Sequence, residues 1–86
     1  MAEQTILIAE DDPDIRDGVR ILLSGEGYHI IEAENGTRAL EVFRPEVDLV
    51  ILDIMMPGMS GLRVCEELRK LSTVPILFLT AKSQES

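Results

Sequence analysis

The sequence predicts an α/β fold with a doubly wound parallel sheet, and two observations lead to this prediction. Residues 6–9, 49–52 and 76–79 are short runs of consecutive apolar side chains, which are typical of parallel strands buried on both faces. Segments with the apolar spacing of helices lie between these runs, and strands that alternate with helices form a parallel sheet with right-handed crossovers. The chain has 86 residues, of which 45% are hydrophobic, and we expect one domain spanning residues 1–86.

The first strand, at residues 6–9, is expected to lead into a helix. Asp12 is suited to cap the helix N-terminus because its carboxylate accepts hydrogen bonds from free amides, and Pro13 then takes the first helical position. Gly25 and Gly27 are expected to end the helix. Its apolar face is expected to carry three residues at positions i, i+4 and i+7, namely Ile15, Val19 and Leu22.

A weaker second strand is expected at residues 29–33, and a short helix at residues 37–44 follows it. This helix is expected to stop before Pro45, because a residue that precedes proline disfavours the helical conformation. Its apolar side chains are Ala39, Leu40 and Phe43.

A third helix is expected between the third and fourth strands, with Ser60 as its N-cap. Pro75 then precedes the last strand. The apolar face of this helix is expected to carry Leu62, Cys65 and Leu68, broadened by Val64 and Leu71.

The charge of the chain argues against several functional classes. The 16 acidic and 8 basic residues give a net charge of −8 at pH 7 without a cluster of Lys or Arg, so this segment is not expected to bind nucleic acid directly. The single cysteine, Cys65, excludes an internal disulfide and fits a reducing compartment. Neither a signal peptide nor a membrane span is expected. We therefore expect a cytoplasmic protein.

Acidic residues follow two of the predicted strands. Glu10 and Asp11 come directly after the first strand, and Asp53 follows the third. If these strands are neighbours, the acids meet at the carboxyl edge of the sheet, where open α/β sheets bind ligands. Carboxylates packed together repel one another unless a cation neutralises them, and Mg²⁺ prefers oxygen ligands of this kind. Asp12, in contrast, is explained by its role as a helix cap.

Three segments resemble the receiver domains of bacterial response regulators. Residues 6–12 resemble the first strand and acidic pair of that family, residues 53–61 its phosphoacceptor segment, and residues 75–81 its fourth strand and switch threonine. Gly58 and Gly61 in the second segment are expected to serve turn geometry. The resemblance implies a flavodoxin-like, doubly wound parallel sheet with the strand order 2-1-3-4.

The resemblance also implies a role for each site residue. Asp53 would accept a phosphoryl group from the phosphohistidine of a sensor histidine kinase, and the hydroxyl of Thr80 would bond a phosphoryl oxygen. Asp11 and Asp53 would bind Mg²⁺ directly, and Glu10 would act through water. The backbone carbonyl of Met55 would complete the protein's share of the coordination. The chain would thus be a signalling protein rather than an enzyme, catalysing at most its own phosphoryl transfer.

Complete receivers have five strands and five helices, whereas this chain stops soon after its fourth predicted strand. We therefore expect a truncated receiver that lacks the fifth strand and the last helix. The family's lysine at the end of strand five has no counterpart here, because Lys82 lies only two residues after Thr80. Truncation is expected to impair activity, since this lysine would place a second cation next to the phosphoryl group.

Two other functional classes stay open. A non-phosphorylated interaction module, or a fragment that serves to study folding, is an alternative because the lysine is absent. An aspartyl-phosphate hydrolase is a weaker alternative, because that class places a second aspartate two residues after its nucleophile, where this chain has Met55.

The fourth strand, at residues 76–79, is expected to have no neighbour on its outer side. An unpaired apolar strand edge tends to pair with another chain. We therefore predict a homodimer that forms through the exposed fourth strand.

Overall fold

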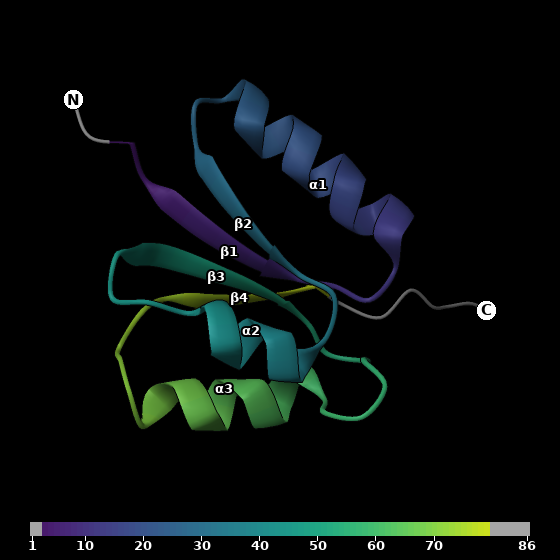
Figure 1. Ribbon diagram of the computed structural model, residues 1–86, viewed down its shortest axis with the longest axis vertical. Coiled ribbons are helices and arrows are strands. Elements are labelled where there is room, and N and C mark those ends of the chain that lie inside the picture. The colour runs from purple at the N-terminus through teal and green to yellow at the C-terminus, as the bar shows by residue number, and fades with distance from the viewer. Residues whose placement is uncertain (1–2, 80–86) are drawn as a thin grey trace.

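The computed structural model describes residues 3–79 and contains four strands and three helices that alternate along the chain (Figure 1). The strands are β1 (Thr5–Ala9), β2 (His29–Ala33), β3 (Val47–Asp53) and β4 (Ile76–Leu79). The helices are α1 (Pro13–Gly25), α2 (Gly36–Val42) and α3 (Gly61–Arg69). Within the described residues all strand pairs are parallel and the order is β2-β1-β3-β4, which confirms the predicted sheet.

The helices lie in two layers, with α1 on one face of the sheet and α2 and α3 on the other (Figure 1). The larger core lies under α2 and α3, and its buried residues are Leu7, Ala9, Ala33, Ala39, Val47, Val50, Leu52, Met56, Val64, Leu68 and Val74. The buried residues under α1 are Ile6, Ile8 and Ile51. Successive residues of β1 and β3 thus contribute to opposite cores, as expected for strands that are apolar on both faces.

Helix α1 begins and ends where the sequence predicted. The Asp12 carboxylate accepts hydrogen bonds from the amides of Asp14 and Ile15, and Gly27, beyond the C-terminus, has a positive φ of 94°. The predicted apolar face was wrong at two of its three positions. Ile15 and Leu22 are exposed, at 37% and 68%, whereas Val19 and the unpredicted Leu23 pack on the core. No helix in residues 3–79 has the length and apolar character needed to cross a membrane.

Helices α2 and α3 form with small differences from the predictions. Helix α2 starts one residue before the expected Thr37, because the Asn35 side chain caps it by accepting from the Arg38 amide, and it ends at Val42. Ser60 caps α3 as predicted. Of the five apolar residues expected on the face of α3, Val64 and Leu68 are buried and Cys65 packs beside them, whereas Leu62 and Leu71 are exposed.

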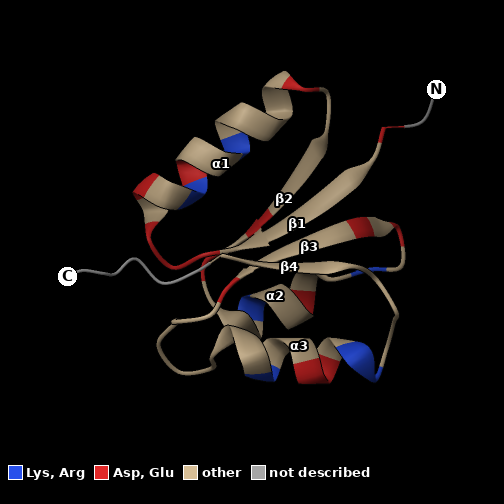
Figure 2. Cartoon of the chain, turned by 180° about the vertical axis from the view of Figure 1, so that it is seen from behind, with Lys and Arg blue, Asp and Glu red and all other residues tan. Residues whose placement is uncertain are grey.

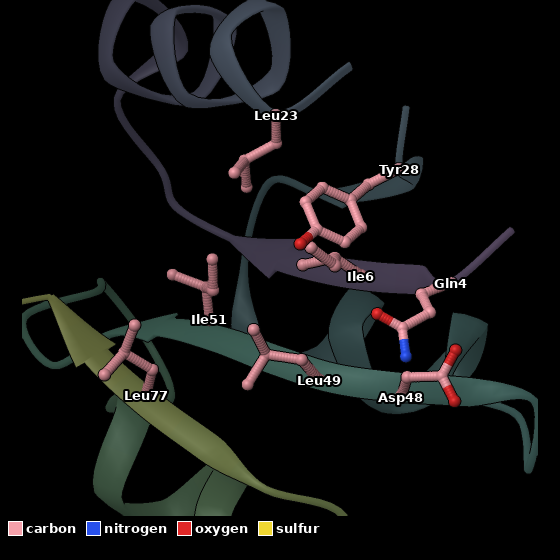
Figure 3. Close-up of a pocket in the computed structure, with 8 residues that line it drawn as sticks. All are labelled: Gln4, Ile6, Leu23, Tyr28, Asp48, Leu49, Ile51 and Leu77. Atoms are coloured by element: carbon pink, nitrogen blue, oxygen red, sulfur yellow. The ribbon is translucent and has the colours of Figure 1, made fainter. Parts of the chain in front are cut away.

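Strand β4 lies at one edge of the sheet, beside β3 and without a second neighbour in the described residues. It is less buried than its apolar run predicted, since Leu77 is 55% exposed. The reason is that α1 packs on β1 and β2 and does not extend across the sheet to β4, so the α1-side face of β4 is left open. A hollow of about 270 Å³ lies there, between Leu23 of α1, Tyr28 and Leu77 (Figure 3).

Candidate metal site at the carboxyl edge of the sheet

The topology brings the acids of two strands to one place. β1 and β3 are neighbours with Ala9 paired to Leu52, so Glu10 and Asp53 are the next residues in register. Both strands end at the same edge of the sheet, where Figure 2 shows acidic residues at the exit of β1 and at the end of β3. The order β2-β1-β3-β4, in which β1 and β3 are the two central strands, is therefore what creates the site.

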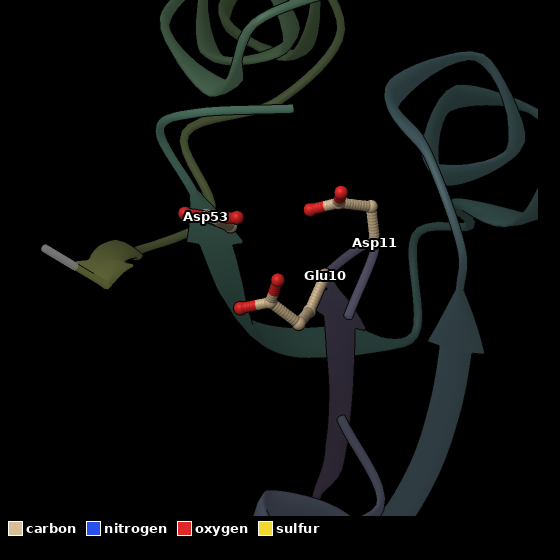
Figure 4. Close-up of side chains that lie close together, drawn as sticks. All are labelled: Glu10, Asp11 and Asp53. Atoms are coloured by element: carbon tan, nitrogen blue, oxygen red, sulfur yellow. The ribbon is translucent and has the colours of Figure 1, made fainter. Parts of the chain in front are cut away.

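Glu10, Asp11 and Asp53 converge at this edge, and their side chains point toward one another (Figure 4). One carboxylate oxygen from each residue lies within 4.8 Å of the others. Glu10 and Asp53 are almost fully buried, at 2% and 1% exposure, while Asp11 is open to solvent. Three carboxylates this close repel one another, and a divalent cation between them would remove the repulsion.

Asp53 has one satisfied and one unsatisfied oxygen. Its Oδ1 accepts a hydrogen bond from the Met55 amide at 3.3 Å. Its Oδ2 is buried and has no hydrogen-bond partner in the described part of the chain. A buried carboxylate oxygen without a partner is costly. A hard cation with oxygen ligands, such as Mg²⁺, fits this atom and the donor set around it.

Glu10 shows the electrostatic strain of the cluster. Burial raises the pKa of Glu10 from its ordinary value of 4.5 to about 7. The Asp12 amide, which donates to Glu10 Oε2 at 3.1 Å, lowers this pKa in part, and the carboxylates of Asp53 and Asp11 raise it further. A bound cation would act in the opposite direction and favour the ionised form of Glu10.

The backbone of Glu10, the first residue after β1, is held by hydrogen bonds at both its amide and its carbonyl. The Glu10 amide donates to the carbonyl of Ala33 on β2 at 3.1 Å. The Glu10 carbonyl accepts a 2.7 Å hydrogen bond from Nη1 of Arg16, a residue of α1. Sequence reasoning missed Arg16, because a lone arginine in an amphipathic helix is ordinary until the fold shows which carbonyl it meets.

The loop after β3 is closed by Gly61, the first residue of α3. The Gly61 amide donates to the Ile54 carbonyl at 2.9 Å, and a Cβ atom at this position would collide with the Asp53 carbonyl oxygen. The expected turn geometry thus applies to Gly58, whose φ is 82°, while Gly61 is required by close approach. This contact fixes the backbone of Asp53 against α3.

Comparison with known proteins decides the family. The sequence matches the response regulator receiver domain over residues 6–86. The chain belongs to this family. It is 54% identical over 78 residues to the uncharacterized transcriptional regulatory protein YrkP of Bacillus subtilis, a match that covers 91% of this chain and 34% of YrkP. The receiver chain spans about a third of the length of the curated relatives it matches.

Two solved structures agree with this assignment. The receiver is 49% identical to the response regulator TrrA of Thermotoga maritima in complex with Mg²⁺-BeF, with a TM-score of 0.85 over 93% of this chain and 71% of that chain. A second structure contains TrrA in complex with the histidine kinase ThkA. The receiver is 48% identical to the matched chain of that complex, with a TM-score of 0.83 over 94% of this chain and 72% of that chain. Response regulators are signalling proteins.

Of the other predicted site residues of the receiver, Met55 lies within the described structure and Thr80 does not. Met55 is 64% exposed and lines an open pocket of about 490 Å³ together with Asp11 and Ser60. Its carbonyl as a metal ligand stays a prediction. Thr80 lies outside the described residues, and so does Lys82.

Proposed function

We propose that this receiver domain accepts a phosphoryl group on Asp53 while Mg²⁺ is bound by Asp11, Asp53 and the carbonyl of Met55, with Glu10 acting through water. The observation that carries the proposal is the convergence of three carboxylates around a buried Asp53 oxygen that has no partner in the described residues. A lone strand-end aspartate would gain little from a cation, whereas a cation would remove the repulsion within this cluster.

Phosphoryl transfer to Asp53 requires the protein mainly to position the reacting groups and to stabilise their charge. An Asp53 oxygen attacks phosphorus in line, a new O–P bond forms, and the bond from phosphorus to the leaving group breaks. Mg²⁺ held by Asp11 and Asp53 would supply positive charge to the phosphoryl oxygens and to the acids. The Met55 amide donates to Asp53 Oδ1 and so orients the carboxylate, and the hydroxyl of Thr80 is proposed to bond a phosphoryl oxygen. The chain would catalyse only its own phosphorylation.

The proposed phosphoryl donor is a phosphohistidine of a sensor histidine kinase. Support comes from the solved complex of the similar regulator TrrA with a histidine kinase, and from the open pocket beside Asp11 and Met55, which leaves room for a donor. The proposed location is the cytoplasm, where the single free thiol of Cys65 stays reduced.

We also propose that the chain forms a homodimer through β4. Within the described residues this strand has an open edge, and Leu77 on it is 55% exposed. Open apolar strand edges favour pairing with a second chain.

Phosphorylation by a small-molecule phosphodonor, read by intact mass, tests the proposed function. The wild-type chain should gain the mass of one phosphoryl group in the presence of Mg²⁺ and none in the presence of a chelator. Asp53→Asn should gain nothing, while Asp48→Asn, at the far end of the same strand, should behave as wild type. An unmodified wild type would favour the interaction-module alternative, and modified Asp53→Asn would place the acceptor elsewhere.

A further inference from the structure

Arg16 connects three elements beside the acid cluster. It lies in the first turns of α1, and its side chain is only 18% exposed. Its Nη1 donates to the Glu10 carbonyl at 2.7 Å, and its Nε lies 3.3 Å from Glu32 Oε1 on β2. The side chain thus links α1, β2 and the residue that immediately precedes Asp11.

We infer that Arg16 is a positioning residue that holds the Glu10–Asp11 segment in the conformation required for cation binding. This inference rests on the proposed magnesium site. The Glu10 carbonyl belongs to the peptide unit that leads into Asp11, so fixing its oxygen fixes the direction in which the Asp11 side chain leaves the backbone. Asp11 is the exposed member of the cluster, so its direction depends on the backbone that carries it.

The geometry requires a guanidinium. Arg16 uses two of its nitrogens in different directions, one toward a backbone carbonyl and one toward a carboxylate. A planar fork with several fixed donors can do this, whereas a lysine ammonium is a single point charge on a flexible stem. The Glu32 carboxylate is oriented in turn by Arg20, whose Nε lies 3.4 Å from Oε2, the oxygen that Arg16 does not use.

The charge of Arg16 and its hydrogen bond to the Glu10 carbonyl would affect Mg²⁺ affinity in opposite directions. A guanidinium next to the cluster repels a divalent cation, so removing the charge alone would strengthen Mg²⁺ binding. Loss of the carbonyl contact frees the Glu10–Asp11 segment and would weaken binding, as loss of supporting contacts around metal sites commonly does by about 10–100-fold. The sign of the change therefore separates a positioning role from an electrostatic one.

Mg²⁺ titration of Arg16→Met in the 86-residue chain tests the inference, with Arg20→Met as the matched control. Both variants remove one positive charge from α1 near Glu32, but only Arg16 contacts the Glu10 carbonyl. We expect the dissociation constant to rise about tenfold in Arg16→Met and to stay the same or fall in Arg20→Met. Arg16→Lys, which keeps the charge, should also bind more weakly than wild type. Equal or tighter binding by Arg16→Met would overturn the inference.

A metal-free readout separates this inference from the proposed function. The Glu10 amide donates to Ala33 of β2, and the Asp12 amide donates to Glu10 Oε2. Hydrogen exchange at both amides should accelerate in Arg16→Met and not in Arg20→Met. If the wild type binds no Mg²⁺, the proposed site fails, while this exchange pattern still supports the positioning role. If Arg16→Met does not fold, Arg16→Lys decides by the same measurements, and wild-type affinity and exchange in Arg16→Lys would overturn the inference.

Discussion

Glu10 and Asp53 are two carboxylates buried at the end of the sheet, and neither forms an ion pair within residues 3–79. Arg16 of α1 donates from Nη1 to the Glu10 carbonyl rather than to the Glu10 carboxylate. Their charges are therefore balanced only in part by backbone amides, from Asp12 and Met55. At the scale of single residues, the metal-free site is a local cost to folding.

This cost predicts an unusual pH dependence of stability. Because burial raises the pKa of Glu10 from 4.5 to about 7, the folded state holds a proton that the unfolded state has already lost in that range. The contribution of Glu10 is therefore full below about pH 4.5 and is lost as the pH rises through about 7. Thermal unfolding of the metal-free chain between pH 5 and 8 should show a falling melting temperature.

The matched variant for this prediction is Glu10→Gln, which stays neutral and keeps an oxygen for the Asp12 amide. Its melting temperature should be nearly constant over the same pH range, and saturating Mg²⁺ should flatten the wild-type curve from pH 7 upward. A wild-type curve with the same slope as that of Glu10→Gln would show that folding does not raise the pKa of Glu10.

The sequence predicted the acids of the site but not the residues that hold them. Glu10, Asp11 and Asp53 could be recognised because they follow two apolar runs whose ends a parallel sheet brings to the same edge. Arg16 and the close packing of Gly61 could not, since both depend on which backbone atoms the fold brings within reach. Such contacts leave no periodic pattern in the sequence.

At the scale of elements, the start of α3 and the end of β3 form one packed unit. Gly61→Ala should lower the free energy of unfolding by about 1–3 kcal/mol, because its Cβ would collide with the Asp53 carbonyl. Urea denaturation measures this change. Gly18→Ala on α1 is the control, because a Cβ at this position would extend into open space. This variant should stabilise the chain by about 0.5–1 kcal/mol. A gain of stability in Gly61→Ala would contradict the packing described.

The elements themselves were predicted better than their buried faces. β2 and β4 have the predicted bounds, and Asp12 and Ser60 cap the helices they were expected to cap, since caps and apolar runs are local signals. The errors at Leu22 and Leu62 come from packing. The sheet contacts Leu23 rather than Leu22 on α1, and Val64 and Leu68 rather than Leu62 on α3. A helical period defines a face only to within one residue.

For the whole molecule, the two faces of the sheet are covered unequally. Of the described helices, α2 and α3 lie on one face and α1 on the other (Figure 1). Within residues 3–79, β4 has no neighbour at its outer edge, and Leu77 is exposed on the α1 side (Figure 3). Light scattering at micromolar concentration should therefore report a dimer. Leu77→Lys should shift it toward the monomer, because a lysine on a strand edge opposes pairing. Leu71→Lys, at a leucine that is exposed beyond α3, should leave the dimer intact. A wild-type monomer would contradict the prediction.

The strand order was predictable at this scale because it follows from few alternatives. Four parallel strands with right-handed crossovers and acids on two of them leave few arrangements that join the acids. The amount of burial on β4 was not predictable, since it depends on where α1 lies across the sheet rather than on the strand's own residues. The position of the acid cluster thus follows from the sheet topology, whereas the exposure of β4 follows from where α1 packs.

The central claim is that acids from β1 and β3 form one magnesium site around Asp53, and calorimetric titration with Mg²⁺ tests it most directly. The wild-type chain should bind one Mg²⁺, and Asp53→Asn should bind at least about tenfold more weakly, because it removes a proposed ligand. Asp48→Asn removes the same charge from β3 at an exposed position where the carboxylate accepts from the Thr5 amide, and it should bind as wild type. Equal Mg²⁺ affinity in the wild type and in Asp53→Asn would contradict the claim.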